Sequence, residues 1–366
     1  MRKSPNANCA NENFMVGLCE VLRLNGDYLA YSRLKLAREL QAYWLVVVSI
    51  NTHILEVTMD RRSFILRAAG ATVLASTSSA FGKLKLFGEE MWESTPTNTF
   101  DLVAIKGGEP DVMFAKGIEA LGGMKAFVKK GQKVVVKPNI GWDVSPERGS
   151  DTNPKLISEI TRQCFGAGAK EVVVFDNTCD NWQRAYKNSG IAPAVADAGG
   201  KMAPGNTEGY FHDVTISGAK NLTNAKVHEL ILESDVFINV PILKSHDSAK
   251  LTMSMKNLMG TVWDRRAWHA NDLHQCIADF AAYRKPDLNI LDAFYVMKRN
   301  GPRGVSEEDI VTMKSQLIST DMVAIDVAGA KLFGMNPSDV RYIQIAAQQK
   351  VGRANLDQLN IKRISL

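Results

Sequence analysis

The sequence predicts an α/β protein, a three-layer sandwich around a mainly parallel, doubly wound sheet. Short runs rich in β-branched residues, such as VVV at 134–136, VVVF at 172–175 and VFI at 236–238, are continuously apolar, as expected of strands covered on both faces. Segments with helical spacing of apolar residues alternate with these runs. With 366 residues, 45% of them hydrophobic and 23% charged, the chain can bury a sizeable core.

The predicted elements alternate in order from residue 100 onward. Strands are predicted at 101–108, 132–140, 171–178, 235–246, 287–294 and 315–321. Helices are predicted at 112–130, 153–166, from 181, at 269–283, at 322–334 and from 337. Pro154 suits the first turn of its helix, and Gly334 closes the helix that contains MVAIDVAGAKLF.

Residues 60–82 predict an export signal. Arg61 and Arg62 are followed by Phe64, an apolar stretch and small residues at Ser78 and Ala80 that suit a signal peptidase. This pattern resembles a twin-arginine signal, which implies the twin-arginine export machinery as a partner and a periplasmic protein. The alternative is an ordinary amphipathic helix. The apolar stretch is too short to span a membrane, so no transmembrane segment is expected in the mature form.

Export signals stand at the N-terminus, so Met59 is the expected start. The predicted organisation is an upstream extension from a misassigned start (1–58), the signal peptide (59–80), a tether (81–99), the α/β domain (100–350) and a C-terminal tail (351–366).

Composition and missing motifs exclude several classes of protein. The net charge of +5 comes mostly from the first 80 residues, and no basic stripe remains to bind nucleic acid. Cys164, Cys179 and Cys276 form no CxxC motif, so neither an iron–sulfur cluster nor a structural zinc site is expected. A Cys164–Cys179 bridge is one option, and buried free thiols are favoured. Dinucleotide-binding, P-loop, hydrolase-elbow and zincin motifs are absent.

Polar residues end five of the predicted strands, where the carboxyl ends of a parallel sheet would meet in one crevice. They are Lys137 and Asn139, Asp176 and Asn177, Lys244 and His246, Asp292, and Asp321. Helix capping is the alternative role for Asp321, a turn for Asp176, and plain exposure to solvent for Lys137.

The segment KSHDSAKLTMSMKNLMG, 244–260, carries the densest set of candidates. Lys244 and His246 are two apart and would point to the same side of a strand, as a pair for binding an anion or moving a proton. The alternation in LTMSM predicts an extended segment that brings Lys256 and Asn257 to the same crevice. His269 and His274 would lie about 140° apart on one helix, which disfavours a metal clamp.

Several of these stretches resemble one protein family, which is called domain of unknown function 362. The resemblance rests on KPNI, VPILKSH, LTMSMKNLMG, His269, ILDAF, GPRG and STDMVAIDVAGAKLFG, and runs from about Leu102 to Ala347. It implies a signature of Lys137, Asn139, Lys244, His246, Lys256, Asn257 and Gly260, but no reaction. Many relatives carry ferredoxin-type cysteine clusters, which this chain lacks.

The sequence therefore predicts an exported protein that binds an anionic small molecule, a carboxylate or a phosphate, at the sheet edge. If it is an enzyme, the catalytic candidates are His246, Lys244, Lys256 and Asp176. The ligand-binding candidates are Lys137, Asn139, Asn257, Gly260, His269 and Arg303, the last in the loop RNGPRG, which is either an anion cradle or a surface turn. The cofactor is undetermined, and Asp176 with Asp292 are the candidates for a divalent metal. The alternatives are a non-catalytic ligand-binding protein, an accessory protein for metal or redox-enzyme assembly, and a redox protein with a noncovalent cofactor.

Overall fold

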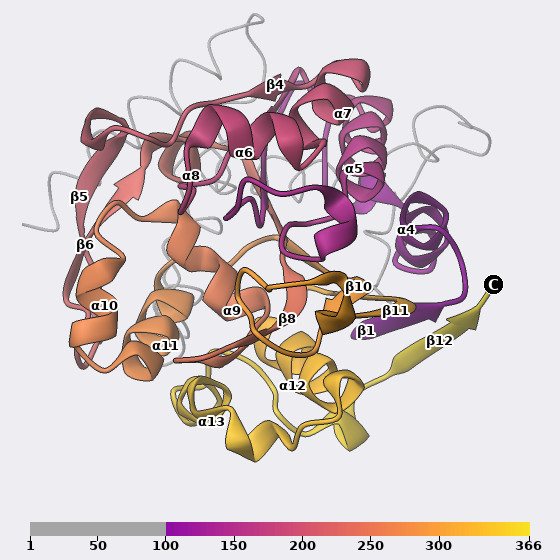
Figure 1. Ribbon diagram of the computed structural model, residues 1–366. Helices are drawn as coiled ribbons and strands as arrows, with labels where there is room; N and C mark the ends of the chain where they lie inside the picture. The colour runs from indigo at the N-terminus through magenta and orange to yellow at the C-terminus, as the bar shows by residue number, and fades with distance from the viewer. Residues whose placement is uncertain (1–99) are drawn as a thin grey trace, which may run out of the picture. The chain divides into compact units, whose positions relative to one another are not determined.

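The computed structural model describes residues 100–366 (Figure 1). The predicted upstream extension, export signal and tether lie outside these residues.

A mainly parallel sheet forms the centre of the fold. Its strands run in the order β12-β1-β11-β10-β7-β2-β3-β4. Their bounds are β1 Leu102–Lys106, β2 Lys133–Pro138, β3 Glu171–Val174, β4 Lys201–Met202, β7 Val236–Val240, β10 Leu288–Met297, β11 Ile310–Ser319 and β12 Ile361–Ser365. The pairs β1–β12, β10–β7, β7–β2, β2–β3 and β3–β4 are parallel, whereas β11 runs antiparallel to both β1 and β10.

Helices cover both faces of this sheet, as the three-layer prediction requires (Figure 1). Side chains of β2 show the division: Val134 and Val136 belong to one core cluster and Val135 to the other. The first cluster includes residues of α4 (Pro110–Glu119), α5 (Pro154–Gly166) and α7 (Ile191–Asp197). The second includes residues of α11 (Leu273–Tyr283), α12 (Met322–Phe333) and α13 (Arg341–Gln348). The α/β sandwich predicted from the apolar strands is therefore confirmed.

Four shorter helices lie between these elements. They are α6 Trp182–Asn188, α8 Glu229–Glu233, α9 Ser254–Asn257 and α10 Arg266–Ala270. A separate antiparallel hairpin is formed by β5 Phe211–Thr215 and β6 Asn224–His228. None of the helices within residues 100–366 is both long and apolar enough to cross a membrane.

Several predicted boundaries are confirmed, and one helix is shorter than predicted. Pro154 begins α5, and Gly334 ends α12 in the left-handed conformation with φ +88°. The helix predicted at 112–130 ends at Glu119, because Gly122 and Gly123 follow with positive φ and turn the chain.

The antiparallel direction of β11 corrects the prediction that five strand ends share one edge. About a dozen residues connect β10 to β11 without a crossover helix, and so short a link joins antiparallel strands. The end of β11 therefore points away from the ends of β2 and β3. Asp321 caps α12 there by accepting hydrogen bonds from the backbone N–H groups of Val323 and Ala324.

The predicted strand 235–246 is divided at Pro241. Its second half, β8 (Ile242–His246), leaves β7 and pairs with β10 and, antiparallel, with β9 (Lys250–Thr252). Residues 351–366, predicted to be a tail, include β12, which pairs with β1 and forms one edge of the sheet.

The prediction that LTMSM is extended throughout is wrong beyond Thr252. The chain turns into α9 because the buried carboxylate of Asp326, on α12, accepts hydrogen bonds from the N–H groups of Ser254 (2.7 Å) and Met255 (3.1 Å). A distant side chain thus caps a helix whose own N-cap residue, Met253, has no capping oxygen.

Candidate functional site

A cavity of about 1080 Å³ opens at the carboxyl ends of β2, β3 and β8. Open α/β sheets commonly bind ligands at this edge. The cavity is lined by nine of the predicted site residues: Lys137, Asn139, Asp176, Lys244, His246, Lys256, Asn257, Gly260 and His269. Most of the candidates chosen from the strand ends and the 244–260 segment therefore come together in space.

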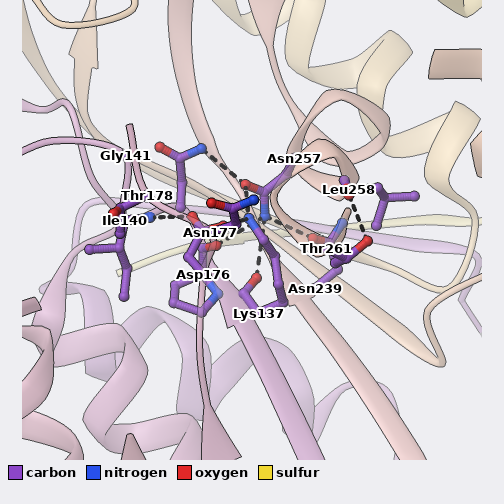
Figure 2. Close-up of polar contacts among 12 residues, drawn as sticks. Lys137, Ile140, Gly141, Asp176, Asn177, Thr178, Asn239, Asn257, Leu258 and Thr261 are labelled. Atoms are coloured by element: carbon purple, nitrogen blue, oxygen red, sulfur yellow. Dashed lines mark hydrogen bonds and ion pairs between the residues drawn. The ribbon is translucent and has the colours of Figure 1, made fainter. Parts of the chain in front are cut away.

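A buried ion pair lies at the base of this cavity. The Lys137 amine is 2.9 Å from Asp176 Oδ1, and each side chain is less than 5% exposed. Burial lowers the pKa of Lys137, and the charge of Asp176 opposes that shift. The second carboxylate oxygen, Oδ2, accepts a hydrogen bond from the Ile140 N–H group (2.7 Å) (Figure 2). Asp176 therefore joins the end of β3 to the loop after β2.

Asn257 connects this ion pair to the rest of the polar network (Figure 2). Its side-chain oxygen accepts hydrogen bonds from the Lys137 amine (2.9 Å) and from Asn139 Nδ2 (3.0 Å). Its own amide group donates to Asn239 Oδ1 (2.8 Å) and to the Lys137 carbonyl (3.2 Å). Since every polar atom of the buried Asn257 side chain is used, this residue is held rigidly.

Lys244 is buried on β8 and reaches across to the same network. Its amine donates to Asn139 Oδ1 (3.0 Å) and to the Ser150 carbonyl. Burial lowers its pKa, while the nearby charge of buried Asp151 opposes the shift. The Asp151 carboxylate is itself held by the N–H groups of Gly141 (2.7 Å) and Trp142 (3.1 Å). No carboxylate within residues 100–366 makes an ion pair with Lys244 at 4 Å or less.

Gly260 leaves the space that the ion pair occupies. A Cβ atom at this position would lie 1.8 Å from Asp176 Oδ1 and 2.6 Å from the Lys137 amine. The Gly260 carbonyl also accepts a hydrogen bond from the Asn177 N–H group (3.1 Å). The short 3₁₀ helix at Leu258–Thr261 can therefore pack onto the ion pair only with glycine at residue 260.

His246 is a neutral hydrogen-bond donor at this site. Burial, together with the charges of Lys256 and Lys244, lowers its pKa to about 2. Its Nδ1 accepts a hydrogen bond from the Ala249 N–H group (3.3 Å), so the neutral ring carries its proton on Nε2. The centre of the His246 ring is 6.4 Å from the centre of the His269 ring, and the two rings are nearly parallel. With both nitrogens assigned in this way, the Nε2–H group donates rather than accepts.

Lys256 and Arg265 also line the cavity, and they differ in their partners. The partly buried Lys256 amine makes no hydrogen bond or ion pair within the part of the chain that the structure describes. Arg265 donates to the carbonyls of Asn177 and Thr178 and to Cys179 Sγ (3.3 Å), with no carboxylate in ion-pair contact among residues 100–366.

Sequence reasoning missed Arg265, Cys179 and the three tryptophans that line the cavity, Trp142, Trp263 and Trp268. They come from loops and a short helix without periodic pattern. The basic and aromatic run WDRRAWH, 263–269, was the available signal. Cys164 and Cys276 are buried free thiols as predicted, whereas Cys179 is a free thiol exposed at the cavity, so it is not bridged to Cys164.

Two predicted residues do not line the cavity. Asp292 lies within β10, where its carboxylate accepts hydrogen bonds from the N–H groups of Asn153 (2.8 Å) and Phe294 (3.0 Å). It supports the first turn of α5 and is not brought beside Asp176. Arg303 is exposed and makes an ion pair with Asp180 (3.4 Å). Residues 100–366 contain no group of three or more His, Cys, Asp or Glu side chains placed to hold a metal ion.

Replacement of Gly260 by alanine should disrupt the base of the cavity. The added Cβ cannot coexist with the Lys137–Asp176 contact, so we expect the free energy of unfolding to fall by at least about 2 kcal/mol. Urea denaturation measures this change. Gly166→Ala is the matched control, because no atom outside the adjoining backbone of α5 lies within 4 Å of its Cβ position. Equal stability of the two variants would contradict the packing described above.

His246 should remain neutral across the physiological pH range. We expect its ring resonances in NMR spectra of the folded protein to stay constant between pH 8 and pH 5, since its pKa is lowered to about 2. In urea the same ring should titrate near its ordinary value of 6.5. The unfolded chain alone gains this proton, so the stability linked to His246 is full above pH 6.5 and decreases as the pH falls. Titration of the folded ring near pH 6.5 would show that it is not desolvated.

Comparisons with known proteins place the chain in a family. The thylakoid-associated protein sll1697 of Synechocystis sp. is 26% identical over 243 residues, which cover 64% of this chain and 73% of that protein. Two solved structures are similar at a TM-score of 0.41. One is a protein from Thermotoga maritima (13% identity, covering 66% of this chain and 60% of that one). The other is the lactate racemase apoprotein from Thermoanaerobacterium thermosaccharolyticum (12% identity, covering 65% and 58%).

The chain thus spans about three fifths of the length of these two structures. The family model for the domain of unknown function DUF362 matches residues 134–331, more than half of the chain, from β2 through most of α12. This protein therefore belongs to the DUF362 family.

Proposed function

We propose that this protein binds an anionic small molecule, a carboxylate or a phosphate, in the cavity at the ends of β2, β3 and β8. The observation that carries the proposal is an excess of unpaired cations. Lys137 has a carboxylate partner at 2.9 Å, whereas Lys244, Lys256 and Arg265 have none within 4 Å among residues 100–366. Charge held in a partly desolvated site is costly without a counterion, and a bound anion would supply it.

Neutral donors strengthen this preference for an anion. The Nε2–H group of His246 belongs to the same cavity, and a hydrogen bond from a neutral imidazole to an oxyanion needs no change of protonation. Lys244 uses two of its three N–H bonds within the protein, which leaves one for a ligand. Two acidic residues that line the cavity, Asp213 and Asp247, make no ion pair with Lys244, Lys256 or Arg265 among residues 100–366.

The proposal also places the protein in the periplasm. Its support is the sequence pattern of Arg61, Arg62 and Phe64 followed by an apolar stretch, which suits export by the twin-arginine pathway.

Anion binding should depend on Lys256. We expect calorimetric titration with inorganic phosphate, acetate and citrate to give saturable binding of at least one anion. Lys256→Met keeps the length of the side chain but removes its charge, so the affinity should fall at least about tenfold.

Lys250→Met is the matched control, because Lys250 is exposed six residues earlier in the same segment and does not line the cavity. This variant should bind like the unmodified protein. The absence of heat with all three anions, or equal affinities for the two variants, would refute anion binding at this site.

A further inference from the structure

Of the four lysines that line the cavity, Lys226 makes an ion pair with Glu208, and the other three are not equivalent. The amines of Lys137 and Lys244 each make two polar contacts with the protein, and both side chains are 1% exposed. The amine of Lys256 makes no hydrogen bond or ion pair with any residue in the range 100–366, although it lies in the same cavity. Lys137 and Lys244 are therefore part of the hydrogen-bond network, whereas the Lys256 amine is available to bind a ligand.

The backbone that carries Lys256 is held firmly. Asp326 binds the two N–H groups at the start of α9, directly before this residue. Asn257, directly after it, is fixed by hydrogen bonds on both its oxygen and its amide nitrogen. A free amine on a fixed backbone is the arrangement expected of a positioned nucleophile rather than of a structural lysine.

The surroundings of Lys256 favour its neutral, nucleophilic form. The pKa of Lys256 is lowered to about 7, and burial is the largest cause. The positive charges of Arg265, Lys244 and Lys137 lower this pKa further, whereas Cys179 raises it. The charge of Lys256 in turn helps to lower the pKa of His246 and of His269, so both rings are neutral at pH 7. The carboxylates of Asp176, Asp247 and Asp264 line the same cavity, and none of them makes an ion pair with Lys256. A substantial fraction of Lys256 is therefore unprotonated near neutral pH.

We propose that Lys256 forms an imine with the aldehyde or ketone group of an anionic substrate, whose carboxylate or phosphate is bound by Lys244 and Arg265. The proposal rests on the anion binding proposed above and narrows the ligand to a carbonyl compound. The lysine nitrogen forms a bond to the carbonyl carbon, the carbonyl oxygen leaves as water with two protons from the amine, and no oxidant or reductant is needed. The Nε2–H group of His246 is the donor in the cavity for the departing oxygen.

Reductive trapping tests this directly. The full-length protein is treated with pyridoxal 5′-phosphate, an aldehyde that carries a phosphate, then reduced with borohydride, digested and mapped by mass spectrometry. We expect one adduct per chain, on Lys256, with a rate that rises through about pH 7. Inorganic phosphate should slow the labelling by competition. Lys250→Arg should be labelled like the unmodified protein, whereas Lys256→Arg should lose the adduct.

An adduct spread over exposed lysines such as Lys116 and Lys201, with Lys256 unlabelled, would overturn the proposal. This result is read on the unmodified protein, so it does not depend on the folding of any variant. Phosphate binding measured by calorimetry on the same sample separates the two claims. Binding without labelling of Lys256 refutes the imine alone. The absence of labelling together with the absence of binding of phosphate, acetate and citrate refutes the anion site as well.

Discussion

The ion pair between Lys137 and Asp176 is the contact on which the cavity depends. It joins the ends of two neighbouring parallel strands, β2 and β3, and it occupies the space that Gly260 leaves open. Removal of one member of such a buried pair typically costs about 3–5 kcal/mol, because the remaining charge stays buried. The pair is therefore a constraint on the whole cavity floor: β2, β3 and the 3₁₀ helix at Leu258–Thr261 must keep their relative positions for it to form.

The network built on this pair separates supporting residues from available ones. Asn257, Asn139 and Asn239 use their amide groups to connect β2, β7 and α9, and this leaves few polar atoms of the floor without partners. Two groups differ from the hydrogen-bonded residues around them. The Lys256 amine and the His246 Nε2–H group have no hydrogen-bond partner among residues 100–366. Polar groups that a protein leaves unsatisfied in a cavity are the ones a ligand can satisfy, which is the physical reason to place function there.

The sequence predicts the residues at the strand ends of this site better than those in the surrounding loops. Lys137, Asp176 and Lys244 could be found because each follows or ends an apolar strand, and carboxyl ends of parallel strands meet at one edge. The same rule failed for Asp321, because β11 runs antiparallel to β10 after a short connection. The direction of a strand depends on the topology of the sheet and cannot be seen in the local sequence pattern. Arg265 was missed because the apolar residues of its loop show neither helical nor strand spacing.

The role of Asp326 shows a similar limit. Alternating apolar residues in LTMSM predict a strand, yet a carboxylate 72 residues away caps the first turn of α9. Local propensity is often overridden in this way by a tertiary contact. The result matters for function, because the helical turn places Lys256 in the cavity beside Arg265 and His246. The sequence predicted that Lys256 lies at the crevice, and it does line the cavity, but it is carried there by a helical turn instead of the extended segment that was predicted.

The most direct test of the account is a crystal structure of the protein grown or soaked with selenate, whose anomalous signal locates an anion without ambiguity. The account predicts a selenate ion in the cavity within hydrogen-bond distance of at least one of the three cations without a carboxylate partner, Lys244, Lys256 and Arg265. A cavity without the anion, with the Lys256 amine bound instead to a carboxylate of the protein, would contradict it.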